Sequence, residues 1–103
     1  MINFTYKHIT QNERLEIYTS QGIKNLTRYI GESYNIRISF YRKFDAKNKL
    51  KEMVEMTTFI DGETFHIEGK SSNFKKSVTE ILEKFERQLR SSRKMMSTLQ
   101  QSA

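Results

Sequence analysis

The sequence of 103 residues has no cysteine, no proline and no tryptophan, and it has only four glycines and two histidines. Without cysteine the protein can form no disulfide bond, no thiolate metal site and no thiol redox centre. His8 and His66 have no ligand-like neighbours at a suitable spacing, so we expect no bound metal and no cofactor. The absence of proline and the scarcity of glycine favour long, regular helices and strands.

Motifs for catalysis, nucleotide binding and membrane insertion are also missing. Gly69-Lys70-Ser71-Ser72 shares residue types with the end of a phosphate-binding loop but lacks the upstream glycine and its spacing. Both histidines lie on predicted strands with no nucleophile motif nearby. The first residues lack the basic start and long apolar run of a signal peptide, and no stretch could span a bilayer. We therefore expect a cytoplasmic protein that is not an enzyme and has no small-molecule substrate.

The size and composition indicate a single domain with a modest core. Hydrophobic residues make up 36% of the chain, and seven phenylalanines and five tyrosines supply much of the apolar surface that folding can bury. This amount suits a two-layer fold but not a large enclosed active site. We expect one domain over residues 1–94 and a short disordered tail over residues 95–103.

Alternation of apolar and polar residues predicts four strands, and apolar spacings of three and four predict two helices. The strands centre on Ile2–His8, Tyr34–Phe40, Val54–Ile60 and Phe65–Ile67. The stripe of the first helix is Leu15, Thr19, Ile23, Leu26 and Ile30. The stripe of the second helix is Phe74, Val78, Ile81, Leu82, Phe85 and Leu89. The order β-α-β-β-β-α predicts an α+β two-layer sandwich, in which a four-stranded, largely antiparallel sheet carries both helices on one face.

Capping and turn residues set the expected boundaries. Thr10 and Glu13 have the spacing of a capping box that starts the first helix, and Gly31 ends that helix. The polar and mostly basic segment 42–49 is expected to be a mobile connection. Asp61-Gly62 predicts a two-residue hairpin turn, since glycine and aspartate tolerate the positive φ that this turn needs.

The second helix has its own boundary signals. The segment 69–73 is expected to break the sheet, and it offers Ser72 or Asn73 as the N-cap. Because the apolar stripe fades toward its end, this helix should fray through Met95 or Met96.

Positive charge is concentrated in the last third of the chain. The net charge of +6 favours an anionic partner. Residues 1–69 carry ten basic and nine acidic side chains, a net of +1, whereas residues 70–103 carry eight and three, a net of +5. The positive field is therefore local to the second helix.

Basic residues on both predicted helices lie away from the apolar stripes. Those of the second helix are Lys76, Lys84, Arg87, Arg90 and Lys94. On the first helix Lys24 and Arg28 are four residues apart, with Arg14 near them. If both helices pack on one sheet face, these outer faces adjoin and make one positive surface. Such a surface suits RNA, because each phosphate contact releases counterions and arginine adds bidentate contacts.

The second helix also offers a simpler explanation for its charge. Glu80, Glu83 and Glu86 each precede a basic residue by four positions, and such pairs stabilise a solvated helix without any partner. They would neutralise part of the basic row. Spacing alone therefore leaves RNA binding and a solvated helix both open.

The segment from Gly69 to Leu89 resembles the last helix of the ribosome hibernation-promoting factors, also called ribosome-associated inhibitors. The best match is Lys84-Phe85-Glu86-Arg87-Gln88-Leu89-Arg90, which is similar to that family's Lys-Leu-Glu-Arg-Gln-Leu run. The expected element order and the opening His8-Ile9-Thr10 are similar too. The resemblance is to the short, single-domain form of the family.

The resemblance implies a stress or stationary-phase protein. Such a protein binds the small ribosomal subunit in the channel used by messenger RNA and by transfer RNA at the A and P sites, and thereby blocks initiation. The positions that match the family's RNA contacts are Arg28, Lys84, Arg87 and Arg90, with Lys70 at the helix entrance. The implied partner is the small subunit and its ribosomal RNA, without a membrane, and we expect a monomer off the ribosome.

The sequence departs from the family at several positions. Lys75 stands where an aromatic residue is usual, and Asn73 replaces an acidic residue. Gly22 and Asn25 occupy places where basic residues of the first helix are often found. These departures make the RNA role of the first helix the weaker half of the hypothesis.

Two alternatives stay open at this point. Lys75-Lys76 at the start of a C-terminal helix resembles a double-stranded-RNA-binding domain, although that module begins with a helix and this chain begins with a strand. A protein-interaction module is the other alternative, with Ile17, Tyr41 or Phe44 as exposed apolar contacts.

Overall fold

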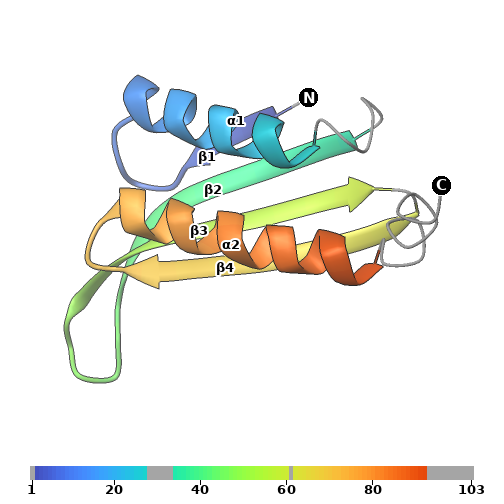
Figure 1. Cartoon of the computed structure of the whole chain (residues 1–103). Coiled ribbons are helices and arrows are strands. Elements are labelled where there is room, and N and C mark those ends of the chain that lie inside the picture. Colours follow the sequence, from blue (N-terminus) through green and yellow to red (C-terminus); the bar gives the residue numbers. More distant parts are fainter. Residues whose placement is uncertain (1, 28–33, 61, 93–103) are drawn as a thin grey trace, which may run out of the picture.

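The computed structural model describes residues 2–27, 34–60 and 62–92, which fold into an α+β two-layer sandwich (Figure 1). The elements are β1 (Ile2–Tyr6), α1 (Glu13–Thr27), β2 (Tyr34–Phe44), β3 (Leu50–Ile60), β4 (Glu63–Ser71) and α2 (Phe74–Ser92). The sheet order is β1-β2-β3-β4, with β1 parallel to β2 and the other neighbours antiparallel. Both helices lie on one face of the sheet, with α2 against β3 and β4. The expected fold class is confirmed, and the leading strand separates it from the double-stranded-RNA-binding alternative.

The core lies between the sheet and the two helices, where the apolar stripes meet. The alternating residues of the strands face the helices, and the stripe of α2 packs onto them. The largest fully buried apolar side chains are Phe40, Phe85, Ile23, Ile36, Ile38, Met53, Met56 and Ile81. Among the described residues, no buried side-chain nitrogen or oxygen lacks a hydrogen-bond partner. The sheet face that points away from the helices is mostly polar, and it also carries Tyr41, the buried Met53 and the exposed Phe59.

The start of α1 differs from the capping box expected at Thr10. The helix begins at Glu13, and Asn12 is its N-cap, because the Asn12 side-chain oxygen accepts the backbone N–H of Leu15 over 3.1 Å. The Tyr6 hydroxyl fixes this entry by donating to the Glu16 carboxylate over 2.8 Å. For α2 the expected cap is confirmed as Asn73, whose side-chain oxygen accepts the N–H of Lys76 over 2.8 Å.

Two expected interruptions of the sheet are wrong. Residues 42–44 belong to β2, and the pairing with β3 continues to the partners Phe44 and Leu50. Only residues 45–49 form the turn. Apolar and polar residues alternate along a strand only where one of its faces is buried. This part of the hairpin lies beyond the core, so its polar residues did not exclude a strand. The Arg42–Glu52 salt bridge of 2.8 Å joins the two strands instead.

The second wrong interruption is at Gly69, which pairs with Val54 inside β4. Glycine is required here by the close approach of α2, because a Cβ would collide with the backbone oxygen of Ser77. The sequence predicted that the strand is interrupted at this residue. Instead, the lack of a side chain at Gly69 allows α2 to pack closely on β4.

The hairpin expected at Asp61-Gly62 is confirmed by the pairing of Ile60 with Glu63 and by the positive φ of 81° at Gly62. Asp61 itself lies outside the described residues. The expected ends of the helices at Gly31 and at Met95 or Met96 also lie outside them, as does the tail over residues 95–103.

Candidate nucleic-acid interface

The outer face of α2 carries basic side chains directly opposite the buried stripe. Lys76 and Arg87 are eleven residues apart, which is about three helical turns, so they point in the same direction. Both are exposed. Neither side chain makes a hydrogen bond or a salt bridge to another described residue. This pair is the part of the basic row that stays available to a partner.

The glutamates of α2 neutralise the row only in part. The expected pairs Glu80–Lys84 and Glu86–Arg90 form, with nitrogen-to-oxygen distances of 2.9 Å and 2.7 Å. The third expected pair, Glu83–Arg87, is not formed between these two described side chains. Arg87 therefore gives none of its donors to a described side chain, while Arg90 is exposed but already has a carboxylate partner.

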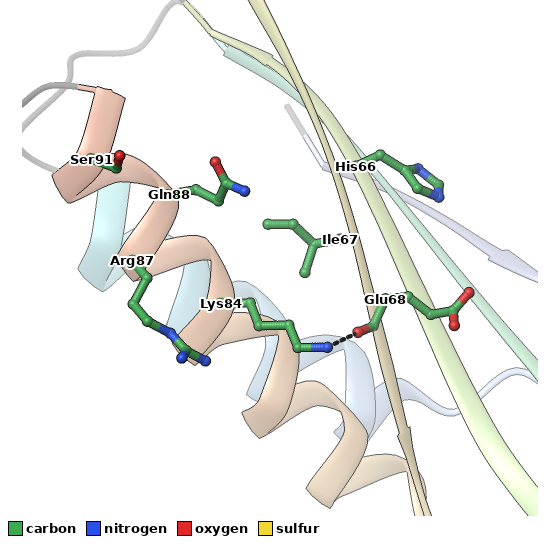
Figure 2. A pocket seen from close by; sticks show the side chains of 7 residues that line it. All are labelled: His66, Ile67, Glu68, Lys84, Arg87, Gln88 and Ser91. Carbon is green, nitrogen blue, oxygen red and sulfur yellow. Dashed lines mark hydrogen bonds between the residues drawn. The ribbon is translucent and has the colours of Figure 1, made fainter.

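Lys84 has a structural role that the sequence did not reveal. Its Nζ donates to the backbone oxygen of Glu68 over 2.7 Å, as Figure 2 shows, and it also pairs with Glu80. The other oxygen of Glu80 accepts the backbone N–H of Lys70 over 2.9 Å. Since β4 is an edge strand, these two side chains satisfy backbone groups that would otherwise face solvent.

The electrostatics of Glu80 follow from these contacts. Burial acts to raise the pKa of Glu80, but the hydrogen bond from the Lys70 N–H and the contact with Lys84 outweigh burial, so the pKa lies below its ordinary value. Glu80 therefore remains a carboxylate at neutral pH.

A shallow groove of about 510 Å³ lies between α2 and the edge of β4 (Figure 2). Lys84 and Arg87 line its helix side, and Ile67 lies on its strand side. The side chains of His66 and Glu68 point away from α2, on the other side of the strand (Figure 2). Gln88 and Ser91 also line the groove, but its charged groups on the helix side are a guanidinium and an ammonium, which suit an anion.

The two helices lie side by side, so their outer faces form one layer of the molecule (Figure 1). The Tyr18 hydroxyl and the Thr79 hydroxyl lie 2.8 Å apart, and a Cβ on Gly22 would collide with Leu82. Gly22, which replaces a basic residue of the family pattern, is thus a helix-contact position. Lys75 adds a cation–π contact to the Tyr18 ring, 5.2 Å from its centroid.

Lys24 is exposed on α1, as expected, but it is offset from α2. It follows the α2-facing Gly22 by two residues, which is about 200° around the helix. The positive surface of the two helices is therefore a broad face rather than one continuous row.

The remaining predicted residues fall in different places. Lys70 lies on β4 rather than at the entrance of α2, and it alternates with Gly69, so its side chain projects on the open sheet face. It is therefore separated by the sheet from the row on α2. Arg28 and Lys94 lie outside the described residues.

Exposed apolar residues were expected to mark a protein-interaction surface. Ile17 is 52% exposed and Phe44 is 61% exposed, as expected. Tyr41 is half-buried, and its hydroxyl donates to Glu55 over 2.7 Å. Within the part of the chain that the structure describes, neither helix has the length and hydrophobicity to cross a membrane.

Comparisons with known proteins agree with this fold. The chain matches, over residues 2–97, the family described as Sigma 54 modulation protein / S30EA ribosomal protein. It is similar to a ribosomal subunit interface protein from Coxiella burnetii, with 25% identity and a TM-score of 0.72 over 89% of this chain and 96% of that chain. It shares the fold of the N-terminal domain of Protein Y from Thermus thermophilus, with a TM-score of 0.73 and 13% identity over 88% of this chain and 96% of that chain. The comparison with curated protein sequences gave no match.

Proposed function

The chain belongs to the Sigma 54 modulation protein / S30EA ribosomal protein family, whose members are ribosome-associated rather than enzymes, and on this premise we propose that it is a ribosome hibernation factor. It binds the small ribosomal subunit in the channel of messenger RNA and of transfer RNA at the A and P sites. Occupying that channel inhibits translation under stress or in stationary phase. The action is non-catalytic, takes place in the cytoplasm, and is carried out by a monomer.

The observation that carries this proposal is a basic pair on the outer face of α2, Lys76 and Arg87, which has no partner among the described residues. A helix that is merely solvated gains from pairing each cation with a glutamate, as Lys84 and Arg90 are paired here. Lys76 and Arg87 depart from that arrangement and point outward together. An exposed guanidinium with all its donors available suits the bidentate binding of a phosphate.

The packing of α1 beside α2 supports a surface wide enough for folded RNA. Lys24 adds charge on α1, and Arg90 adds charge at the far end of α2. Lys84 is part of the interface through its position, but its ammonium is already held by two oxygens. We therefore propose Arg87 and Lys76 as the principal RNA contacts, with Lys24 and Arg90 around them.

The test is co-sedimentation of the protein with purified small ribosomal subunits across a series of salt concentrations. The unmodified protein should bind in low salt and dissociate as salt rises, since phosphate contacts release counterions. Arg87→Glu should lower the affinity about tenfold or more. Arg37→Glu, which makes the same charge change at an exposed position on the open sheet face, is the matched control and should bind normally.

An equal loss of affinity in Arg87→Glu and Arg37→Glu would show that only net charge matters, and it would contradict the assignment of the outer face of α2 as the binding surface. A second measurement concerns the channel itself. The protein should prevent binding of messenger RNA and initiator transfer RNA to the small subunit, and Arg87→Glu should restore that binding.

A further inference from the structure

The hairpin between β2 and β3 projects past the rest of the sheet (Figure 1). The last partner of β1 on β2 is Phe40, and the last partner of β4 on β3 is Glu52. Strand pairing nevertheless continues to Phe44 and Leu50. We call residues 42–51 the hairpin arm, which extends from the same end of the molecule as the start of α2, where Arg42 lies 5.6 Å from the centre of the Phe74 ring.

The hairpin arm is more positively charged than α2. Residues 42–51 carry five basic side chains and one acidic side chain, a net of +4, whereas residues 74–92 carry five and three, a net of +2. The net charge of residues 1–69 as a whole does not show this excess, because acidic residues outside the arm offset the positive charge of the arm. Arg42 pairs with Glu52, and Lys51 lies 3.9 Å from Asp45.

The other basic side chains of the arm have no such partner. Lys43, Lys47 and Lys49 are exposed, and none of them makes a side-chain hydrogen bond or salt bridge to a described residue. A hollow of about 180 Å³ beside the arm is lined by Lys43, Lys51 and the predicted site residue Lys70. Asp45 and Glu68 also line the hollow and offset part of its charge.

Two large apolar side chains lie exposed on the arm, on the sheet face opposite to that of Lys43. Phe44 is 61% exposed and Leu50 is 50% exposed, and they are direct partners across the two strands. They extend the apolar face of the sheet past the start of α2, where the helices no longer cover it (Figure 1). An exposed aromatic ring on a basic element is the combination with which proteins stack unpaired bases and hold the neighbouring phosphates.

The turn of the arm is ordered before any partner binds. The Asp45 carboxylate accepts the backbone N–H groups of Lys47 and Lys49, each over 2.9 Å. Asn48 has a φ of 61°, and its backbone N–H donates to the backbone oxygen of Asp45 over 2.9 Å. A turn that is fixed in this way loses little conformational entropy on binding.

We propose that the hairpin arm is a second RNA-binding element, which takes a single-stranded segment of RNA. Lys43, Lys47 and Lys49 contact its phosphates, and an unpaired base stacks on Phe44. This inference rests on the proposed function for the identity of the polyanion as ribosomal RNA. Charge complementarity selects RNA over a protein partner, because the apolar pair is small and the charge of the arm is predominantly positive, with a net of +4 over residues 42–51.

Affinity for small ribosomal subunits tests the arm with matched variants. Phe44→Ala should lower the affinity about tenfold, which is the size of a lost base-stacking contact. Phe59→Ala is the control, because Phe59 is 57% exposed on the same strand pair but lies at the other end, far from the arm. Lys47→Glu with Lys49→Glu should weaken binding and reduce its salt dependence by about one unit of log–log slope per lost contact. Melting temperatures close to that of the unmodified protein show that these surface variants fold.

Photo-cross-linking from a photoreactive amino acid placed at position 47 identifies the partner of the arm. Cross-links to ribosomal RNA support the inference, and cross-links to ribosomal proteins alone overturn it. Normal binding by the arm variants together with weakened binding by Arg87→Glu also overturns it, while leaving the proposed function intact. Weakened arm variants together with normal binding by Arg87→Glu support the arm and remove the proposed surface on α2.

Discussion

The Nζ atom of Lys84 lies 2.7 Å from the backbone oxygen of Glu68, so a side chain assigned to RNA by resemblance also closes the edge of the sheet. The same ammonium pairs with Glu80 on its own helix. An ammonium held by two oxygens offers fewer donors to a phosphate than a free guanidinium does. The resemblance between Lys84–Arg90 and the family's run therefore combines two physical roles, one in the fold and one on the surface.

The first prediction separates these two roles by comparing Lys84→Met with Arg87→Met. Lys84→Met should destabilise the protein by about 1 kcal/mol, because a backbone oxygen and a carboxylate lose their partner at a partly exposed site. It should weaken binding to small subunits less than Arg87→Met does. Urea unfolding and co-sedimentation measure the two effects.

Arg87→Met should in turn leave stability within about 0.5 kcal/mol of the unmodified protein, since the residue is exposed and its side chain bonds to no described residue. The reverse ranking, with Lys84→Met the weaker binder and Arg87→Met the less stable protein, would contradict the assignment.

The second prediction concerns acid stability through Glu80. Its pKa is lower in the folded protein than its ordinary value of 4.5. A depressed folded-state pKa contributes stability that is present above the ordinary value and lost as the pH falls through the folded-state value. The free energy of unfolding should therefore decrease as the pH is lowered below about 4.5.

Glu80→Gln tests whether this carboxylate contributes to the acid loss. The variant should be less stable at neutral pH and should show a shallower fall in stability in acid. An identical acid profile in the two proteins would place the loss in other carboxylates, such as Asp45, whose pKa is also lowered, chiefly by the hydrogen bond from the Lys49 N–H.

The third prediction concerns the packing of α2 on β4 at Gly69. Gly69→Ala should destabilise the protein by about 1–3 kcal/mol, because the new methyl group collides with the backbone of Ser77 and with Ile81. Gly62→Ala is the comparison variant. Its methyl group meets nothing within 4 Å, so only the positive φ of 81° should cost stability, by about 1 kcal/mol.

Urea unfolding should rank Gly69→Ala below Gly62→Ala. Because Gly69 supports the helix that carries Arg87, its variant should also bind small subunits more weakly. A Gly69→Ala protein as stable as the unmodified one would show that the helix can move away from the strand without cost.

The periodic parts of the fold could be predicted from the sequence, because burial imposes its own pattern. The alternation at Ile36, Ile38 and Phe40 and the stripe from Val78 to Leu89 both follow from one buried face. Features outside the core leave no such pattern. The strand pairing of Phe44 with Leu50 and the close packing at Gly69 depend on residues distant in sequence or on solvent-exposed faces.

The candidate site could be predicted only in part for a related reason. Sequence spacing identifies three glutamate pairs on α2, but it does not show that Glu80 accepts the Lys70 N–H or that Glu83 and Arg87 do not pair with each other. These outcomes depend on where β4 lies. The positive charge of residues 42–51 was visible in the sequence, but most of this segment was interpreted as a mobile connection rather than as a binding element.

The last prediction distinguishes RNA binding from a merely solvated helix, and it uses Glu86. Its carboxylate lies 2.7 Å from Arg90 on the outer part of α2. An exposed pair of this kind contributes only about 0.3–0.5 kcal/mol to stability. Glu86→Gln should thus cost little stability, while it frees Arg90 and removes one negative charge from the surface that faces RNA.

If α2 contacts RNA phosphates, the affinity of Glu86→Gln for small subunits should rise about threefold at low salt, and this gain should shrink as salt screens the added charge. If the glutamates of α2 serve only to solvate the helix, affinity should not change. Glu63→Gln, which removes one negative charge from an exposed position on β4, is the control. A gain of equal size in that variant would assign the effect to net charge, whereas a gain confined to Glu86→Gln locates the RNA on the helix.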